Sequence, residues 1–284
     1  MAAKQARRDP SIVRRPVTRV TGRSHETRRE TSRETFEDAI AVERPMEIRV
    51  DGRALAVTLR TPGHDRELAL GFLAGEGVIA SAAGVAGVRE TEADCSDAPD
   101  LVEVTLAPGT VVDWTRLERH FAATAACGLC GRAHLDALRA GLVPVAAGPP
   151  ISVEALLALP ARVRGDQATF EATGGLHAAV WCDAALEPRV LREDVGRHNA
   201  VDKVCGWLME QGRRPAGEGL LWVSGRAGAE LVLKAARAGI PAMAAVGAPS
   251  SLAVELAEAA AMTLVGFLRE GRMNVYAGER RVGG

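Results

Sequence analysis

The second half of the chain alternates between short apolar runs and stretches with helical periodicity. The apolar runs have the length of buried strands, and between them apolar residues recur every three or four positions, which indicates helices. Strands are expected at 176–182, 189–192, 220–223, 242–246 and 263–268, and helices at 201–209, 227–238 and 252–261. This order is typical of a parallel sheet that helices cover on both faces.

The first half has weaker patterns. Alternating residues at 47–50 and 55–59 are joined by Asp51-Gly52-Arg53, which predicts a β-hairpin. A helix is expected at 67–74, a strand at 101–106, and further helices at 115–126 and 133–140. We therefore expect a smaller α+β subdomain over 36–150, with the Pro- and Gly-rich stretch 143–150 as a joint, and an α/β domain over 151–284.

Residues 1–35 precede these patterns. Basic residues outnumber acidic ones there, and large apolar residues are few. Such a segment buries too little surface to offset the entropy lost when a chain becomes ordered. The composition predicts a disordered basic tail, and an arm that binds anions or a partner is the alternative.

Composition excludes several classes of function. The chain has 284 residues, a formal net charge of -1 and 4% aromatic residues, so it lacks the basic charge and the stacking surface of nucleic-acid binders. No apolar stretch has the length of a membrane span, and the N-terminus does not look like a secretory signal. Five cysteines, an odd number in a long chain, argue against a secreted disulfide scaffold. We expect a cytoplasmic protein that binds neither nucleic acid nor membrane.

The sharpest local motif is Cys127-Gly-Leu-Cys130, followed by Gly131. Two thiols at this spacing suit a metal, a redox disulfide or a persulfide. A zinc site needs four ligands, and here His134 with either Cys95 or His177 would have to complete it. A helical pattern precedes the pair, which disfavours a thioredoxin-like motif, whereas a loop flanked by glycines suits a thiolate that must reach two partners.

Three loops follow the expected strands, at 224–228, 247–251 and 269–272. In open α/β sheets, ligands bind in the crevice outside the carboxyl ends of the strands. Glycine and serine in these loops let backbone N–H groups approach an anion, and the N-termini of the following helices favour negative charge. Arg226, Arg269 and Arg272 could add cationic contacts. The loops predict a phosphorylated ligand such as a nucleotide, and plain tight turns are the alternative.

A dense polar stretch, residues 193–203, leads into the helix expected at 201–209. Because the apolar residues of this helix face the core, we do not expect Asn199, Asp202 and Lys203 all to be buried with them. Such a concentration of His, Asn, Asp and Lys is typical of a site, whereas a capped helix with a solvated charged face is the alternative. His177, in the sequence Thr173-Gly-Gly-Leu-His177, is expected to face the same crevice, and the alternative is a structural histidine in a strand.

These stretches, in this order, resemble the FdhD family of formate dehydrogenase accessory proteins. The resemblance covers roughly residues 45–278, and it is carried by 127–131, 173–177, 194–203, 224–226 and 267–276. The Asp-Val-Gly-Arg-His-Asn-Ala sequence that begins at Asp194 is very specific, whereas a CxxC pair alone is not.

The resemblance implies a sulfurtransferase. Such a protein takes sulfur as a persulfide from a cysteine desulfurase and passes it to the bis-guanine-dinucleotide form of the molybdenum cofactor, as the terminal sulfido ligand of formate dehydrogenase. Cys127 matches the persulfide-bearing position, and Cys130 is its partner. The stretch assigned to cofactor contact is matched by Phe267, Leu268, Arg269, Glu270, Gly271 and Arg272. We expect Ser224, Arg226, His177 and His198 in the same crevice, and no stably bound metal.

The resemblance also implies a fold, namely a cytidine deaminase-like three-layer α/β/α domain with a smaller N-terminal α+β subdomain. A zinc deaminase needs His-x-Glu and Pro-Cys-x-x-Cys, but Ala178 and Ala179 follow His177 and no proline precedes Cys127. Guanosine diphosphate is expected to bind as a fragment of the cofactor. The expected partners are a cysteine desulfurase, the catalytic subunit of formate dehydrogenase and a second copy in a homodimer. The alternatives are a zinc-dependent deaminase-like hydrolase and a nucleotide- or cofactor-binding chaperone without covalent sulfur transfer.

Overall fold

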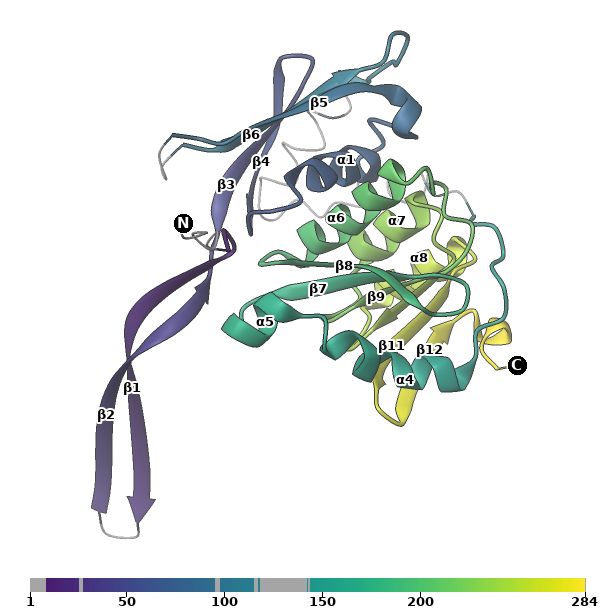
Figure 1. Cartoon of the computed structure of the whole chain (residues 1–284). Coiled ribbons are helices and arrows are strands. Elements are labelled where there is room, and N and C mark those ends of the chain that lie inside the picture. The colour runs from purple at the N-terminus through teal and green to yellow at the C-terminus, as the bar shows by residue number, and fades with distance from the viewer. Residues whose placement is uncertain are drawn as a thin grey trace, which may run out of the picture.

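The computed structural model describes residues 9–25, 28–94, 98–114, 117, 142 and 144–283. Its largest part is a six-stranded sheet with the order β12-β11-β10-β9-β7-β8 (Figure 1). The strands are β7 (His177–Cys182), β8 (Pro188–Asp194), β9 (Leu220–Val223), β10 (Ala242–Ala245), β11 (Thr263–Arg269) and β12 (Arg272–Ala277). The central strands are short and wholly apolar because both of their faces are buried.

Helices cover both faces of this sheet and make three layers. The helices α6 (Arg197–Glu210), α7 (Ala229–Arg237) and α8 (Ser251–Ala259) pack on one face, and α4 (Val153–Arg164) packs on the other. The α/β class and three-layer arrangement are therefore confirmed, and likeness to cytidine deaminases stays a prediction. The expectation of a parallel sheet is correct only in part, because only the neighbouring pairs β9–β10 and β10–β11 are parallel. β7, β8 and β12 join through antiparallel pairs instead, since tight turns connect β7 to β8 and β11 to β12.

A four-stranded sheet with the order β4-β3-β6-β5 forms the smaller unit. Its strands are β3 (Arg44–Val50), β4 (Arg53–Arg60), β5 (Val85–Thr91) and β6 (Asp100–Leu106), and α1 (Asp65–Gly75) packs against its apolar face. The predicted hairpin across residues 51–53 is confirmed. The helices predicted at 115–126 and 133–140 lie outside the described residues, apart from the single residue 117.

The two units meet where α1 crosses α6. A Cβ built on Gly71 of α1 would lie 1.8 Å from the carbonyl oxygen of Asp202, and one on Gly206 of α6 would lie 1.8 Å from that of Glu67. Only residues without a side chain permit this approach, so the pair of glycines sets the distance between the helices. α6 is consequently covered on one side by the large sheet and on the other by α1.

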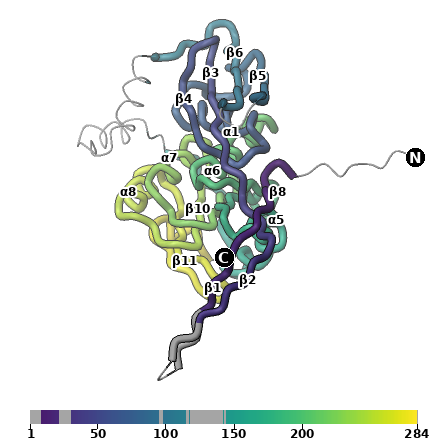
Figure 2. Tube along the Cα trace, turned by 90° about the vertical axis from the view of Figure 1, so that its left-hand side faces the viewer, coloured from purple at the N-terminus to yellow at the C-terminus, as the bar shows by residue number. Residues whose placement is uncertain are grey.

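The disordered tail predicted for residues 1–35 is wrong for the part that the structure describes. β1 (Ile12–His25) and β2 (Arg28–Ala41) form an antiparallel ribbon that projects from the body in both views (Figures 1 and 2), and β2 continues beyond residue 35. The strands alternate, and charges of opposite sign face each other across them, as with Arg15 opposite Asp38 and Arg19 opposite Glu34. This cross-strand complementarity favours the ribbon in spite of its polar composition.

Candidate functional site

The carboxyl ends of β8, β9, β10 and β11 meet at one edge of the large sheet, where α6, α7 and α8 begin. Backbone hydrogen bonds join the loops at this edge: the N–H of Gly247 donates to the carbonyl of Gly225, and that of Phe267 donates to the carbonyl of Gly247. A Cβ on Gly247 would lie 3.0 Å from the Gly225 oxygen. The loops and the N-termini of three helices therefore meet at this edge, which we call the crevice after the ligand site expected there, and the ligand site itself stays a prediction.

His177 and Ser224 lie side by side at this edge. The Ser224 hydroxyl accepts a hydrogen bond of 2.9 Å from the Ala178 N–H, and the Ser224 N–H donates to the Ala178 carbonyl. These bonds fix the loop after β9 to the start of β7. They also bring Gly225 against the imidazole of His177, because a Cβ at position 225 would lie 3.4 Å from its Nδ1. Burial and, after it, the nearby Arg197 lower the pKa of His177, which favours the neutral ring.

His198, in the first turn of α6, faces the first turn of α7. Its Nε2 lies 3.2 Å from Oε2 of Glu230, a residue that sequence reasoning did not single out. Burial lowers the pKa of His198, and Glu230 opposes this by raising it. The two histidines and Glu230 therefore gather from β7, α6 and α7 at the same edge of the sheet, where the lowered pKa values of His177 and His198 favour neutral rings.

The stretch 267–272 forms the far end of this edge. Phe267 has φ +52°, a conformation that a bulky side chain seldom adopts, and the pairing between β11 and β12 shifts register there. Arg269 pairs with Arg272 across the turn formed by Glu270 and Gly271. The segment is therefore a tight hairpin turn, and it leads into the strand β12, which the sequence analysis did not expect. Arg226, Arg269 and Arg272 are exposed, and Leu268 is buried in the core.

The polar stretch 193–203 serves a different purpose from the one expected. Asn199, Asp202 and Lys203 are all buried, contrary to the prediction that they would not be. The Nζ of Lys203 lies 2.7 Å from Oδ2 of Asp194 and also donates to the carbonyl of Thr61. The reason is α1, which covers the side of α6 that the sequence pattern left open to solvent.

These buried groups tie the small unit to the large one. The Asn199 side-chain amide donates to the carbonyl of Leu59 on β4 and to Oδ1 of Asp194. Oδ2 of Asp194 accepts from the backbone N–H of Thr61. Because hydrogen bonds to buried charges are strong and costly to leave unmade, the motif holds β4 and the following loop against α6. The crevice residue in this stretch is His198.

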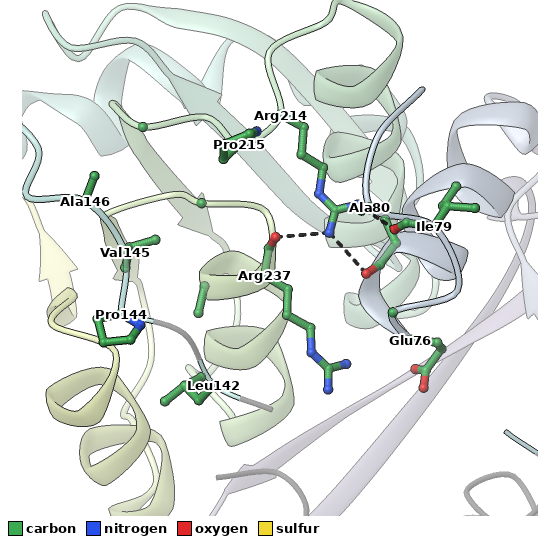
Figure 3. A pocket seen from close by; sticks show the side chains of 15 residues that line it. Glu76, Ile79, Ala80, Leu142, Pro144, Val145, Ala146, Arg214, Pro215 and Arg237 are labelled. Atoms are coloured by element: carbon green, nitrogen blue, oxygen red, sulfur yellow. Dashed lines mark hydrogen bonds between the residues drawn. The ribbon is translucent and has the colours of Figure 1, made fainter. Parts of the chain in front are cut away.

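A second buried ion pair lies deeper, between α6 and α7. The Nζ of Lys234 is 2.7 and 2.8 Å from the two carboxylate oxygens of Asp202. Burial raises the pKa of Asp202 to about 6, against the attraction of Lys234. A cavity of about 560 Å³ lies at the opposite edge of the sheet, near the end of α7 (Figure 3).

This cavity has mainly apolar walls. Arg214 reaches into it and donates to the backbone carbonyls of Ala74, Ile79 and Arg237 (Figure 3). The guanidinium of Arg237 also donates to the carbonyl of Gly75. These bonds join the end of α1 to the end of α7. The cavity thus marks a second junction of the two units, on the far side from the crevice.

The cysteines divide into two groups. Cys182 on β7 and Cys205 on α6 are buried, and burial raises the pKa of each thiol to about 12. Such thiols are protonated at neutral pH and are poor nucleophiles. The other three cysteines and His134 lie outside the described residues, so neither the CxxC pair nor the scattered zinc set is placed: Cys95, Cys127, Cys130 and His134. Within the described ranges, no group of three or more His, Cys, Asp or Glu could hold a metal ion.

Comparison with known proteins now decides the family. Residues 41–283 match the model of the FdhD/NarQ family. This chain belongs to that family. The sulfur carrier protein FdhD of Streptomyces avermitilis is 48% identical over 254 residues, which is 87% of this chain and 90% of that protein. The FdhD protein of Mycolicibacterium paratuberculosis is 46% identical over 275 residues, which is 95% of this chain and 98% of that protein.

A solved structure shows the same fold. It is described as a formate dehydrogenase accessory protein from Desulfotalea psychrophila, with a TM-score of 0.67 and 24% identity over 94% of this chain and 99% of that one. The match to the FdhD/NarQ family model includes both sheets and the crevice but begins at the last residue of β2. Across the described part of this family member, no helix is long and apolar enough to span a membrane.

Proposed function

We propose that this protein is a sulfurtransferase that accepts persulfide sulfur from a cysteine desulfurase. It delivers that sulfur to Mo-bis-guanine dinucleotide before the cofactor enters the catalytic subunit of formate dehydrogenase. The proposal is supported by relatives at 46–48% identity that are named sulfur carrier proteins. The name given to the Desulfotalea psychrophila protein points to the same client enzyme.

The observation that carries the cofactor half of the proposal is the crevice. The cofactor is cargo here, and its guanine nucleotides bear several phosphates. The loops at Gly225 and Gly247 approach closely, since a Cβ built on Gly247 would lie 3.0 Å from the Gly225 carbonyl oxygen, and glycine suits this position. The N-termini of α6, α7 and α8 point to the same edge. Arg226, Arg269 and Arg272 supply exposed guanidinium groups that suit phosphate.

The sulfur half of the proposal depends on Cys127, with Cys130 as its partner. The thiolate of Cys127 would attack the terminal sulfur of the donor persulfide, so that a new S–S bond forms and the old one breaks. The donor leaves as a thiolate with the electron pair of the broken bond, and Cys127 then carries the persulfide. Cys182 and Cys205 are unsuited to this role because each thiol is buried with a pKa of about 12.

Intact mass spectrometry tests the sulfur half directly. Incubation with a desulfurase and cysteine should add about one sulfur, roughly 32 Da, which dithiothreitol removes. The Cys127→Ala variant should not gain this mass and should leave formate dehydrogenase assembled but inactive. A Cys182→Ala variant is the matched control and should be loaded like the parent. Sulfur found on Cys182 or Cys205, with Cys127 unmodified, would contradict the proposed carrier.

The proposed reaction belongs in the cytoplasm, where thiols stay reduced. The same cysteine variants also separate the rival functions. A zinc hydrolase would show stoichiometric zinc that is lost when Cys127 and Cys130 are replaced. A cofactor-binding chaperone without covalent chemistry would still activate formate dehydrogenase after Cys127→Ala. Either result would remove the sulfurtransferase role while leaving the family membership intact.

A further inference from the structure

Among the described strands of the small sheet, β4 and β5 form the two edges, and they differ in how they are protected (Figure 1). A sheet edge carries unpaired backbone groups that another strand can join, and proteins commonly block it with charges, bulges or short strands. β5 is blocked in this way, because its register shifts ahead of Gly87 and its exposed residues include Arg89 and Glu90. β4 instead exposes two large apolar residues, Val57 at 65% and Leu59 at 56%.

The direction of the backbone groups of β4 follows from Pro45, which lies opposite Leu59 on β3. Antiparallel ladders alternate between residue pairs that exchange both backbone hydrogen bonds and pairs that exchange none. Proline has no N–H, so this pair is of the second kind and the carbonyl of Leu59 points away from β3. The side-chain amide of Asn199, which donates to this carbonyl at 2.8 Å, agrees with that direction. Val57 lies two residues earlier in the same register and points its N–H and carbonyl the same way, and within the described part of the chain nothing bonds to them.

The side chains of Val57 and Leu59 lie on the solvent face of the small sheet. Val57 is opposite Glu47 and Leu59 is opposite Pro45, and paired residues of an antiparallel ladder share a face. The alternate residues of β3, such as Met46, are buried on the other face, where α1 packs. The outer edge of β4, defined as the backbone groups and side chains of Val57 and Leu59, therefore combines open hydrogen-bonding groups with exposed apolar surface. Both features suit a sheet that accepts an extended strand of another protein.

This edge lies next to the crevice. Asn199, which binds the carbonyl of Leu59, also accepts from the hydroxyl of Thr58 at 3.3 Å, and it follows His198 in the first turn of α6. A strand added to β4 therefore reaches the crevice at one end. A protein that receives a ligand from the crevice has to approach this place, and the Desulfotalea psychrophila protein of the same fold is described as a formate dehydrogenase accessory protein.

Charge distinguishes between the occupants of this edge. The charged residues of β4 are both arginines: Arg60 is buried in ion pairs with Asp65 and Asp100, whereas Arg53 is exposed. A partner strand with a carboxylate near Arg53 is favoured, whereas β4 of a second copy would bring only further arginines. The occupant that fits is a strand of another protein, apolar at alternate positions and acidic at one end.

We propose that the outer edge of β4 is the docking surface for the catalytic subunit of formate dehydrogenase, which adds such a strand to the small sheet. The apolar side chains of that strand pack on Val57 and Leu59, its backbone bonds to Val57, and its carboxylate faces Arg53. The recipient of the ligand then lies beside the crevice. The identity of the partner rests on the proposed function, whereas the surface is defined by this chain alone.

Biolayer interferometry tests this surface with the full-length chain and the purified catalytic subunit, prepared without its molybdenum cofactor. Val57→Asp and Leu59→Asp should each weaken binding at least about tenfold, because a carboxylate replaces an apolar contact and repels an acidic strand. Both side chains are largely exposed, so the melting temperature should stay that of the parent. Val20→Asp is the matched control and should bind like the parent, since Val20 is 55% exposed on the ribbon of β1 and β2, away from β4.

A backbone variant separates an added strand from a contact of side chains alone. Val57→Pro removes an N–H that points away from β3, so the ladder between β3 and β4 keeps its bonds while the partner strand loses a donor. It should weaken binding of the catalytic subunit more than Val57→Ala, which loses side-chain contact but keeps the N–H. Equal binding of these two variants, both with the melting temperature of the parent, would contradict strand addition.

The outcomes also separate this surface from the proposed function. Sulfur loading of Cys127, read by intact mass, should be the same in the parent and in the Asp variants. A loaded parent whose Asp variants bind the catalytic subunit as tightly as it does would overturn the docking surface alone, as would a loaded parent that does not bind the subunit. Asp variants that change the sedimentation of the protein by itself, and not its binding to the subunit, would assign the edge to a second copy and overturn the proposal. A parent that takes up no sulfur, but whose binding to the subunit is lost in the Asp variants, would remove the sulfurtransferase role and support the surface.

Discussion

The ammonium group of Lys203 lies 2.7 Å from Oδ2 of Asp194, with 1% and 0% of the two side chains exposed. This pair is at the centre of the junction between the two units, because Asp194 also accepts from Thr61 and Asn199. The motif that identifies the family in the sequence is therefore in large part a structural joint. It holds β4 and α1 against α6, whereas His198 of the same motif lies at the crevice.

Replacing one member of this pair should be costly. Lys203→Met leaves the carboxylate of Asp194 buried without its cation, and removal of one partner of a buried pair costs about 3–5 kcal/mol of unfolding free energy. Urea unfolding measures the loss. Glu218→Gln is the control. It removes an exposed ion pair with Arg213, whose atoms are 3.9 Å apart, and should change the unfolding free energy by less than about 0.5 kcal/mol. Equal effects of the two changes would contradict the central role of Lys203.

The crossing of α1 and α6 makes a steric prediction. Gly206→Ala puts a methyl group 1.8 Å from the carbonyl oxygen of Glu67, so the helices must separate. We expect a loss of about 1–3 kcal/mol or more, with hydrogen exchange rising first in β3, β4 and α1. Gly165→Ala is a matched change with open space around the new methyl group, and it should be neutral or slightly stabilising. An unperturbed Gly206→Ala protein would mean that the two helices are farther apart.

The sequence predicted some parts of the fold well because the signal there is local. The strands β9, β10 and β11 are uninterrupted apolar runs, and the strand-to-helix order places the crevice at their carboxyl ends. β12 was not predicted, because residues 269–272 were interpreted only as a ligand-binding loop at the end of the last expected strand. α4 was not predicted because Pro160 lies inside the helix. Its N-terminus does carry an ordinary signal, since the Ser152 side chain caps it.

Other parts depend on contacts that are distant in the sequence. The residues of the stretch 193–203 do not indicate that α1 will cover it. Its polar groups were therefore not all expected to be buried. The ribbon of β1 and β2 was judged by composition alone, whereas its register sets Arg15 opposite Asp38 and Arg19 opposite Glu34. Of the crevice residues, Glu230 could not be found from sequence because its role is defined by its distance to His198.

The pair of Asp202 and Lys234 makes a prediction about pH. The folded pKa of Asp202, about 6, lies above its ordinary value of 3.8, so between these values the folded protein holds a proton that the unfolded chain has lost. This group therefore makes stability fall as pH rises through that window. Lys234→Met removes the cation that lowers the pKa, which extends the window upward beyond pH 6.

Unfolding free energies measured from pH 5 to 8 test this sign. Through Asp202, the unfolding free energy of the Lys234→Met protein should continue to fall above pH 6, by up to about 1.4 kcal/mol per pH unit. The unfolding free energy of the parent should show no such fall there. The double variant Asp202→Asn, Lys234→Met lacks the titrating carboxyl and should not show this slope. A single variant that runs parallel to the parent across this range would mean that Asp202 is not the group responsible.

The two buried thiols predict a pattern of chemical labelling. With pKa values of about 12, Cys182 and Cys205 should not react with iodoacetamide at pH 8 in the folded protein. Both should be labelled fully in 6 M guanidinium chloride, as peptide mass spectrometry can show. Cys127 is the comparison within the same sample, and a sulfur carrier requires that it react. Rapid labelling of Cys182 or Cys205 in the native state would contradict their burial.

The crevice makes the last prediction, which concerns guanosine diphosphate as a fragment of the cofactor. If Arg272 contacts its phosphates, Arg272→Ala should weaken binding by roughly ten-fold to a hundred-fold, since a hydrogen bond to a charged group is worth on the order of 1.5–3 kcal/mol. Arg280→Ala is a matched control, because Arg280 is exposed and lies just beyond β12, outside the loops of the crevice. Titration calorimetry measures both. Equal losses of affinity in the two variants would mean that the effect comes from net charge and not from a contact of Arg272. A parent protein that binds no guanosine diphosphate would contradict a phosphate site in the crevice. Such a result would leave the sulfur half of the proposal standing, because the mass of the Cys127 adduct is measured without any nucleotide.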